Sequence, residues 1–121
     1  MNIKELCVAA HNNSANHGFW DDYNQTLSFL PTCLDIDKYT LDIKLSKIAL
    51  IMSELGEAVE GIRKPTADPH CPGFSSEEIE MADVLIRIFD YCEAFGLDLA
   101  GAVTTKMAFN QTRPYKHSKG A

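Results

Sequence analysis

A row of apolar residues at helical spacing occupies the middle of this chain and requires a long α-helix there. The row consists of Leu41, Leu45, Ile48, Met52, Leu55, Val59 and Ile62. Residues that recur three or four positions apart lie along one face of an α-helix. Pro65 ends the pattern, because proline lacks an N–H donor and disfavours helical geometry in the residue before it. The pattern therefore predicts a helix from about Asp37 or Thr40 to Lys64.

A second helix is predicted at the start of the chain, from about Ile3 to Asn16. Its apolar positions also recur at helical spacing, and Gly18 supplies a stop signal. The aromatic segment that follows is less regular, and Pro31 interrupts it. We expect a loop with short helical pieces in this segment.

Two more helices are predicted after the proline-rich connector that begins at Pro65. Ser75 and Glu78 have the spacing of a capping box, which predicts a helix from about Ser76 to Phe95. Its expected buried face consists of Ile79, Ala82, Leu85, Ile86, Phe89 and Cys92. The last helix follows Leu97 and Asp98 and runs to about Thr112, before Pro114.

The predicted fold is an all-α single domain that resembles a four-helix bundle. It spans residues 1–121 and ends in a polar tail from about residue 113. A chain of 121 residues fits one hydrophobic core. No segment alternates apolar and polar residues between turns, so no strand is predicted.

Composition excludes several other classes of protein. The formal net charge of −6 argues against a nucleic-acid-binding surface, which needs a basic patch. No apolar run approaches the ~18 residues that span a bilayer, and the polar start does not resemble a secretory signal. We therefore expect a cytoplasmic protein. The four cysteines are scattered, which predicts neither a disulfide framework nor a zinc site.

Two pairs of carboxylates lie inside the predicted helices. Glu54 and Glu57 form one pair, and Glu80 and Asp83 form the other. Two residues three positions apart lie on the same side of a helix, so each helix presents two acids to a neighbour. Four acids facing one another in an apolar setting ionise together only if a cation neutralises them. The pairs predict a site for a hard cation with oxygen ligands.

Two cationic side chains and one amide side chain lie in a row on the last predicted helix, and we call them the cationic row. Lys106, Asn110 and Arg113 are spaced four and three residues apart and share one face. Lysine offers a point charge, and arginine offers a planar fork that matches phosphate oxygens. A carboxylate cluster that holds Mg²⁺ and a cationic row nearby are the two parts expected of a phosphate-transfer site.

These motifs resemble those of the MazG-like nucleoside triphosphate pyrophosphohydrolases, which belong to the all-α NTP pyrophosphatase superfamily. The resemblance rests on the pattern E-x-x-E, a gap, and E-x-x-D, and on the K-x-x-x-N-x-x-R ending. It covers about residues 45–117, and a weaker resemblance extends to the segment HGFWDD. It is strongest with the short, single-domain members of the family. One departure is Ser53, since many relatives have a second glutamate immediately before the first pair.

The resemblance implies Mg²⁺-dependent cleavage between the α and β phosphates, with Mn²⁺ as a possible substitute, to give a nucleoside monophosphate and pyrophosphate. The implied metal ligands are Glu54, Glu57, Glu80 and Asp83. Glu54 is also the implied catalytic residue that positions or deprotonates the attacking water. The implied phosphate or sugar contacts are Lys106, Asn110, Arg113 and Tyr115. Helices of this family pair between subunits, which implies a homodimer or a tetramer of two dimers.

The sequence gives weaker evidence of a functional role for three further residues. Trp20 and His17 are candidates for a base pocket, because an indole can stack on a nucleobase. Core packing is the competing role for Trp20. Arg87 lies one turn after Asp83 and two turns after Glu80, so an ion pair with either acid is expected there.

Two other functions compete with nucleotide hydrolysis. A carboxylate-bridged di-iron bundle also pairs acids on facing helices, but it favours Glu-x-x-His motifs, and neither pair here contains histidine. A non-catalytic helical interaction module could line a dimer seam with the same acids. Only nucleotide hydrolysis gives Lys106, Asn110 and Arg113 a joint purpose.

Overall fold

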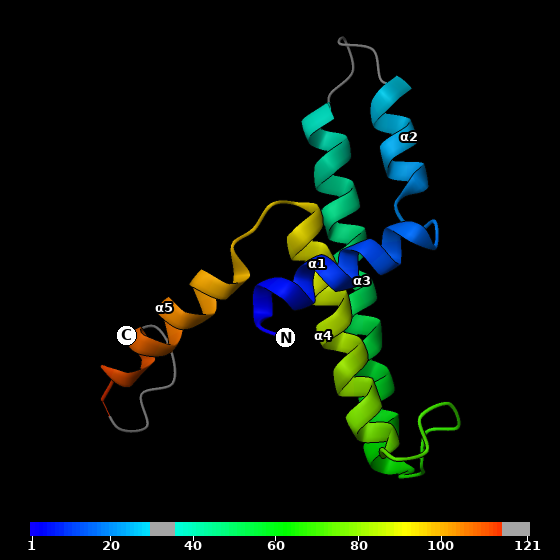
Figure 1. Ribbon diagram of the computed structural model, residues 1–121, viewed down its shortest axis with the longest axis vertical. Helices are drawn as coiled ribbons and strands as arrows, with labels where there is room; N and C mark the ends of the chain where they lie inside the picture. The colour runs from blue at the N-terminus through cyan, green and yellow to red at the C-terminus, as the bar shows by residue number, and fades with distance from the viewer. Residues whose placement is uncertain (30–35, 115–121) are drawn as a thin grey trace.

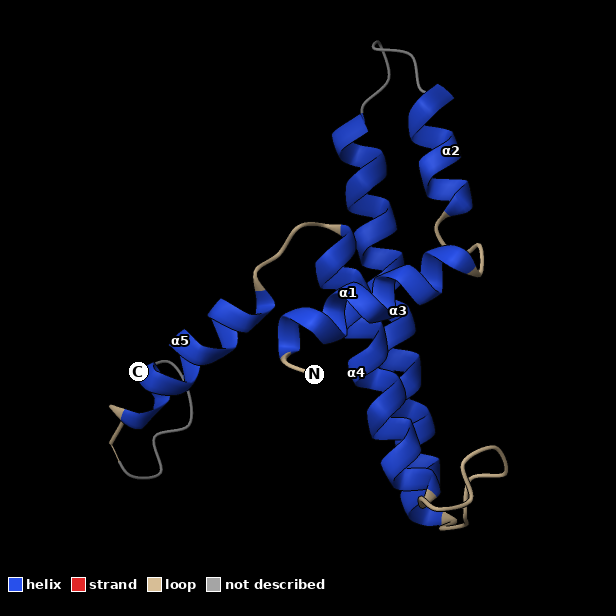
Figure 2. Cartoon of the chain, viewed as in Figure 1, coloured by secondary structure: helices blue, strands red, loops and turns tan. Residues whose placement is uncertain are grey.

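The chain folds into five α-helices in a computed structural model that describes residues 1–29 and 36–114 (Figure 1). The helices are α1 (Ile3–Asn16), α2 (Asp21–Phe29), α3 (Ile36–Arg63), α4 (Ser76–Ala94) and α5 (Leu99–Gln111). The described ranges contain no strand, and their one isolated bridge joins Ala67 to Ser75 (Figure 2). The predicted all-α class is confirmed, and α2 lies in the aromatic segment, where the sequence predicts short helical pieces.

Local capping interactions explain where three of the helices begin. Asn2 and Glu5 form a capping box at the start of α1, and Ser75 and Glu78 form the predicted one at the start of α4. The side chain of Asp98 accepts a hydrogen bond from an amide in the first turn of α5. These side chains satisfy amide groups that have no partner inside the helix.

Glycines lie just beyond the ends of α1 and α4. Gly18 and Gly96 have φ values of 86° and 66°, a region that glycine enters without steric cost. The sequence therefore predicts both helix ends within a residue or two, since the signals are local.

The helices α3 and α4 form an antiparallel hairpin that is the centre of the molecule, and α1 crosses it (Figure 1). The helix α2 lies beside the N-terminal part of α3, where the rings of Tyr23 and Tyr39 stack with centroids 5.9 Å apart. By contrast, α5 contacts α1 and projects away from the hairpin (Figure 1). The fold thus positions α3 and α4 closely and leaves α5 as an arm.

The core is small, and its largest fully buried side chain is that of Trp20. The buried apolar residues in the described ranges are Cys7, Trp20, Ala58, Val84 and Cys92. Trp20 makes edge-on contacts with His11, Tyr23 and Phe95 at centroid distances of 5.5 to 5.9 Å. Such contacts add to the stability that burial of the large indole provides.

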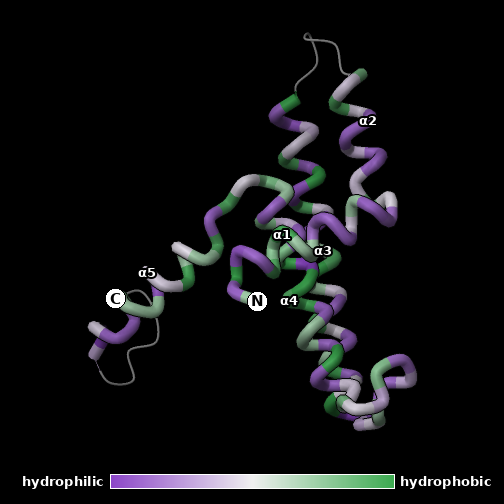
Figure 3. Tube along the Cα trace, viewed as in Figure 1, coloured by the Kyte–Doolittle hydropathy of each residue, from purple (hydrophilic) through white to green (hydrophobic). Residues whose placement is uncertain are grey.

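The apolar row of α3, defined as Leu41, Leu45, Ile48, Met52, Leu55, Val59 and Ile62, lies outside this core. All seven side chains are 40% to 65% exposed, and apolar segments recur along the helix (Figure 3). On α4, Leu85 and Ile86 are also about half exposed, so the prediction that both belong to a buried face is wrong for the single chain. The single chain leaves all these apolar side chains exposed.

The described cysteines are free thiols, and Cys33 lies outside the described residues. Burial raises the pKa of the thiols of Cys7 and Cys92, which keeps them protonated inside the core. In the described ranges, no helix has both the length and the apolar character needed to cross a membrane.

Candidate metal and nucleotide site

Three of the predicted metal ligands come together between α3 and α4. Glu54 extends from α3, and Glu80 and Asp83 extend from the first half of α4. One carboxylate oxygen from each residue lies within 4.8 Å of those of the other two. All three residues are partly buried, and the cluster contains no histidine or cysteine. A set of carboxylate oxygens suits Mg²⁺ or Mn²⁺ and lacks the imidazole ligands of a di-iron bundle.

Small residues on α3 set the distance between the two helices. Ala58 and Gly61 follow Glu54 at spacings of four and three residues, so the three share the face toward α4. Both small residues are buried. A Cβ atom on Gly61 would lie 3.3 Å from the backbone nitrogen of Glu77, at the start of α4. This close approach brings Glu54 opposite the acids of α4.

Glu57 is exposed and is not part of the three-residue cluster. Three residues of helix rotate a side chain by about 60° relative to Glu54, which turns Glu57 toward the margin of the helix contact. Its charge still acts on the site, because Glu57 is one of the acids that raise the pKa of Glu80. The structure thus brings together three of the four predicted ligands and leaves Glu57 beside them.

The acids of α4 resist ionisation in this arrangement. Burial, and then repulsion from Asp83, Glu54 and Glu57, raises the pKa of Glu80 above its usual range. Burial and the charge of Glu54 likewise raise the pKa of Asp83, while Arg87 partly offsets the effect. A bound divalent cation reverses this balance, since it favours the charged form of each carboxylate.

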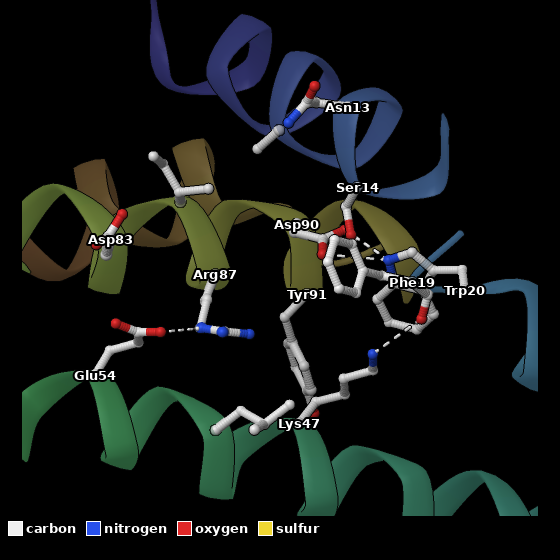
Figure 4. Close-up of a pocket in the computed structure, with 13 residues that line it drawn as sticks. Asn13, Ser14, Phe19, Trp20, Lys47, Glu54, Asp83, Arg87, Asp90 and Tyr91 are labelled. Atoms are coloured by element: carbon white, nitrogen blue, oxygen red, sulfur yellow. Dashed lines mark hydrogen bonds and ion pairs between the residues drawn. The ribbon is translucent and has the colours of Figure 1, made fainter. Parts of the chain in front are cut away.

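Arg87 makes an ion pair across the helix contact. Its Nε donates a hydrogen bond to Glu54 Oε1 at 2.7 Å (Figure 4). The partner is therefore an acid of α3, where the sequence predicts an acid of the arginine's own helix. The glutamate side chain is 18% exposed and the arginine side chain 43%, so the pair lies at the edge of the site.

A cavity of about 450 Å³ extends from the acid cluster toward Trp20 (Figure 4). Glu54 and Asp83 lie at one end, and aromatic side chains lie at the other. The lining residues come from α1, the following turn, α3 and α4. They are Ala10, Asn13, Ser14, Phe19, Trp20, Lys47, Leu50, Glu54, Asp83, Ile86, Arg87, Asp90 and Tyr91. The cavity combines charged groups beside the carboxylates with an apolar and aromatic wall, which is the composition of a small-molecule site.

Trp20 lines this cavity but is held by its neighbours. It is 2% exposed, and its Nε1 donates to Asp90 at 2.9 Å, while Asp90 also pairs with His11 Nδ1 at 2.7 Å. Lys47 Nζ lies 4.2 Å from the centroid of the indole and donates to the carbonyl of Phe19. Trp20 therefore acts as a core anchor at the cavity wall.

Sequence reasoning did not identify Lys47, Asp90 or His11 as members of this region. A usable signal exists for two of them, because Lys47 precedes Glu54 by seven residues and Asp90 follows Asp83 by seven. Residues seven apart lie on the same helix face. His11 has no comparable signal, since its position depends on how α1 crosses α4.

The predicted cationic row lies elsewhere in the chain. Lys106 and Arg113 both lie over the ring of Phe109, with the lysine Nζ 4.7 Å and the arginine Cζ 5.0 Å from its centroid. Asn110 is exposed on the same helix. Because α5 projects away from the hairpin, one chain does not bring this row to the acid cluster (Figure 1).

His17 and Tyr115 are the two remaining predicted substrate contacts. His17 caps the end of α1, where its Nδ1 donates to the carbonyl of Asn13 at 2.7 Å, and it does not line the cavity. Tyr115 lies outside the described residues.

Comparison of the chain with protein-family models, curated proteins and solved structures finds no match.

Proposed function

We propose that this protein is a Mg²⁺-dependent nucleoside triphosphate pyrophosphohydrolase of the MazG-like type. The observation that carries the proposal is the cluster of Glu54, Glu80 and Asp83 at one end of a cavity with cationic and aromatic walls. Carboxylates that share a hard cation with substrate phosphates are a common arrangement in enzymes that act on nucleotides. The products are a nucleoside monophosphate and pyrophosphate.

The cation required is Mg²⁺, with Mn²⁺ as a substitute. Both ions take oxygen ligands. A bound cation offsets the burial and the mutual repulsion that raise the pKa values of Glu80 and Asp83. Glu57 is the fourth proposed ligand, since its charge already acts on Glu80. When bound, the cation neutralises carboxylate and phosphate charge and makes a bound water more acidic.

Glu54 is the proposed residue that positions the attacking water and accepts its proton. The water oxygen bonds to the α-phosphorus, and the bond from this phosphorus to the bridging oxygen breaks, so that pyrophosphate leaves. Glu54 suits the role because it lies at the boundary between the acid cluster and the cavity. In the cavity, the wall near Trp20 is the proposed place for the base.

A second copy of the chain is the proposed source of the cationic row. The separation of α5 from the hairpin means that Lys106, Asn110 and Arg113 reach a nucleotide at the acid cluster only from another chain. The exposed apolar row of α3 supports such an assembly, because its alternating spacing of four and three residues is that of helices that pair side by side. We therefore propose a homodimer, or a tetramer of two dimers.

Substitution of the ligands tests the enzyme assignment. Glu80→Gln and Glu57→Gln each remove a negative charge with little change in shape, and each is expected to lower pyrophosphate release by roughly 100-fold or more. Glu60→Gln is the matched control, because Glu60 is an exposed residue of α3 that pairs with Arg63 outside the cluster. Full activity of Glu80→Gln would show that the ligand assignment is wrong.

A further inference from the structure

Arg87 lies between the acid cluster and the cavity and faces both. Its Nε donates to Glu54, while the rest of the guanidinium group extends on the side away from Glu54, into the cavity (Figure 4). With 43% of its side chain exposed, the group is accessible to a molecule that enters the cavity. One planar side chain thus contacts a proposed metal ligand and the proposed substrate space.

Among the described residues, the lining of this cavity carries three acids and two cationic residues. Glu54, Asp83 and Asp90 all line it, and they repel the phosphate groups of an entering nucleotide. Arg87 and Lys47 are the two cationic residues of the described lining. Lys47 is engaged at the far end, above the indole of Trp20 and with the carbonyl of Phe19. Arg87 is therefore the cationic side chain placed beside the acid cluster.

We propose that Arg87 binds a phosphate group of the nucleotide at the boundary between the carboxylate cluster and the cavity. The proposal rests on the proposed function and adds a substrate-binding residue from the same chain. The guanidinium fork has donors on more than one edge, so it can hold Glu54 through Nε and present its terminal N–H groups to phosphate oxygens. A lysine at this position would not provide the same two-sided contact.

A purely structural role for Arg87 predicts different behaviour. If the arginine serves only to orient Glu54 or to hold α3 against α4, its loss weakens the metal site and destabilises the fold. If it binds phosphate, its loss weakens nucleotide binding while the metal site, relieved of a neighbouring positive charge, binds a cation at least as tightly as before. The two roles therefore differ in whether nucleotide binding weakens without a matching loss of metal affinity.

The test compares Arg87→Gln, Arg87→Lys and the wild-type protein in two titrations. The first measures binding of Mn²⁺ alone by calorimetry. The second measures binding of the α,β-methylene analogues of the four common deoxynucleoside triphosphates in excess Mg²⁺. Arg63→Gln is the matched control, because Arg63 also pairs with a glutamate of α3 but lies on the surface away from the cavity.

For Arg87→Gln we expect Mn²⁺ affinity equal to or up to about 10-fold tighter than that of the wild type. For each analogue that the wild type binds, we expect the affinity of Arg87→Gln to be weaker by roughly 10- to 100-fold, because charge-assisted hydrogen bonds to phosphate are lost. Arg87→Lys should fall between the two proteins, and Arg63→Gln should match the wild type.

Two outcomes overturn the inference in distinguishable ways. If the wild type binds Mn²⁺ and an analogue, but Arg87→Gln binds the analogue equally well, or loses affinity for it only in proportion to a loss of affinity for Mn²⁺, Arg87 is not a phosphate ligand and the proposed function stands. If the wild type binds neither Mn²⁺ nor any analogue, the proposed function and the role of Arg87 both fall.

Discussion

Glu54, Glu80 and Asp83 place three carboxylates within 4.8 Å of one another on two helices of one hairpin. Burial and mutual repulsion raise the pKa of both α4 acids. The spacing of the acids in the sequence predicts this cluster, because residues three apart share a helix face. Glu57 is exposed and lies outside the cluster, because the face of α3 toward α4 carries Glu54, Ala58 and Gly61.

The metal-free protein should become more stable when Glu80 is replaced by glutamine. A raised pKa means that the folded state binds the proton of Glu80 more tightly than the unfolded state does, so ionised Glu80 lowers the free energy of unfolding. In EDTA at pH 7, we expect Glu80→Gln to raise Tm by roughly 1 to 3 °C. The advantage should disappear as the pH falls through the raised pKa toward the ordinary value of 4.5, where the wild-type carboxyl is protonated as well.

Addition of Mg²⁺ provides the control for this effect. Wild-type Tm should rise by several degrees in excess Mg²⁺, because a ligand that binds only the folded state stabilises it. Glu80→Gln should show little or no rise. A metal-free Glu80→Gln protein that is less stable than the wild type at pH 7 would contradict the origin assigned to the raised pKa.

At the scale of helices, α3 has two apolar faces with different roles. One face carries Ala58 and Gly61 and packs closely on α4, which sets the geometry of the acid cluster. The other face is the exposed apolar row. The sequence predicts the helix and the exposed row, because periodicity and the proline stop are local. It does not predict that the chain buries the face with Ala58 and Gly61 instead, since that depends on contacts between segments far apart in sequence.

Gly61→Val should destabilise the hairpin. A Cβ atom at this position would lie 3.3 Å from the backbone nitrogen of Glu77, and the two methyl groups of valine would force α3 and α4 apart. We expect a loss of roughly 1 to 3 kcal/mol in the free energy of unfolding, measured by urea denaturation.

Gly56→Val is the matched control, because a Cβ atom on Gly56 meets nothing within 4 Å. Valine there should change stability by no more than a few tenths of a kcal/mol, since it replaces the unfavourable helix propensity of glycine. Equal stability of the two variants would contradict the close helix approach at Gly61.

At the scale of the molecule, the described residues bury few side chains and leave many large apolar side chains exposed. The row on α3, the half-exposed residues of α4, and Met107 and Phe109 of the projecting α5 all remain open on one chain. Exposed apolar surface of this extent marks sites of protein association. It agrees with the proposed dimer, in which the row and the arm pack against a second copy.

Leu45→Lys should break this assembly. The leucine is 60% exposed and belongs to the apolar row. Two lysines brought together across a helix interface would lose their hydration and repel each other, which would destabilise the dimer. We expect light scattering after gel filtration to show the mass of the assembly for the wild type and a shift to the monomer for the variant. Ser46→Lys adds the same charge one residue away on another exposed face and should leave the mass unchanged. A wild-type monomer would contradict the proposed dimer, and a dimeric Leu45→Lys would contradict the role of the row.

If the protein is a dimer but does not hydrolyse nucleotides, the result would favour the alternative function, a non-catalytic helical interaction module. In that function the acids only line the dimer interface. The choice between the two functions therefore depends on chemistry. The acid cluster and the cavity support catalysis, and the exposed row is compatible with either function.

The most direct test is product analysis of the wild-type protein with a broad panel of canonical and damaged (d)NTPs. Each nucleotide is incubated with Mg²⁺, with Mn²⁺ or with EDTA, and the phosphorus-containing products are identified by ³¹P NMR. We predict that at least one nucleotide yields its monophosphate and pyrophosphate, with no orthophosphate as a first product and no turnover in EDTA. Absence of turnover across the panel in both metals, or release of orthophosphate from the γ position, would contradict the assignment.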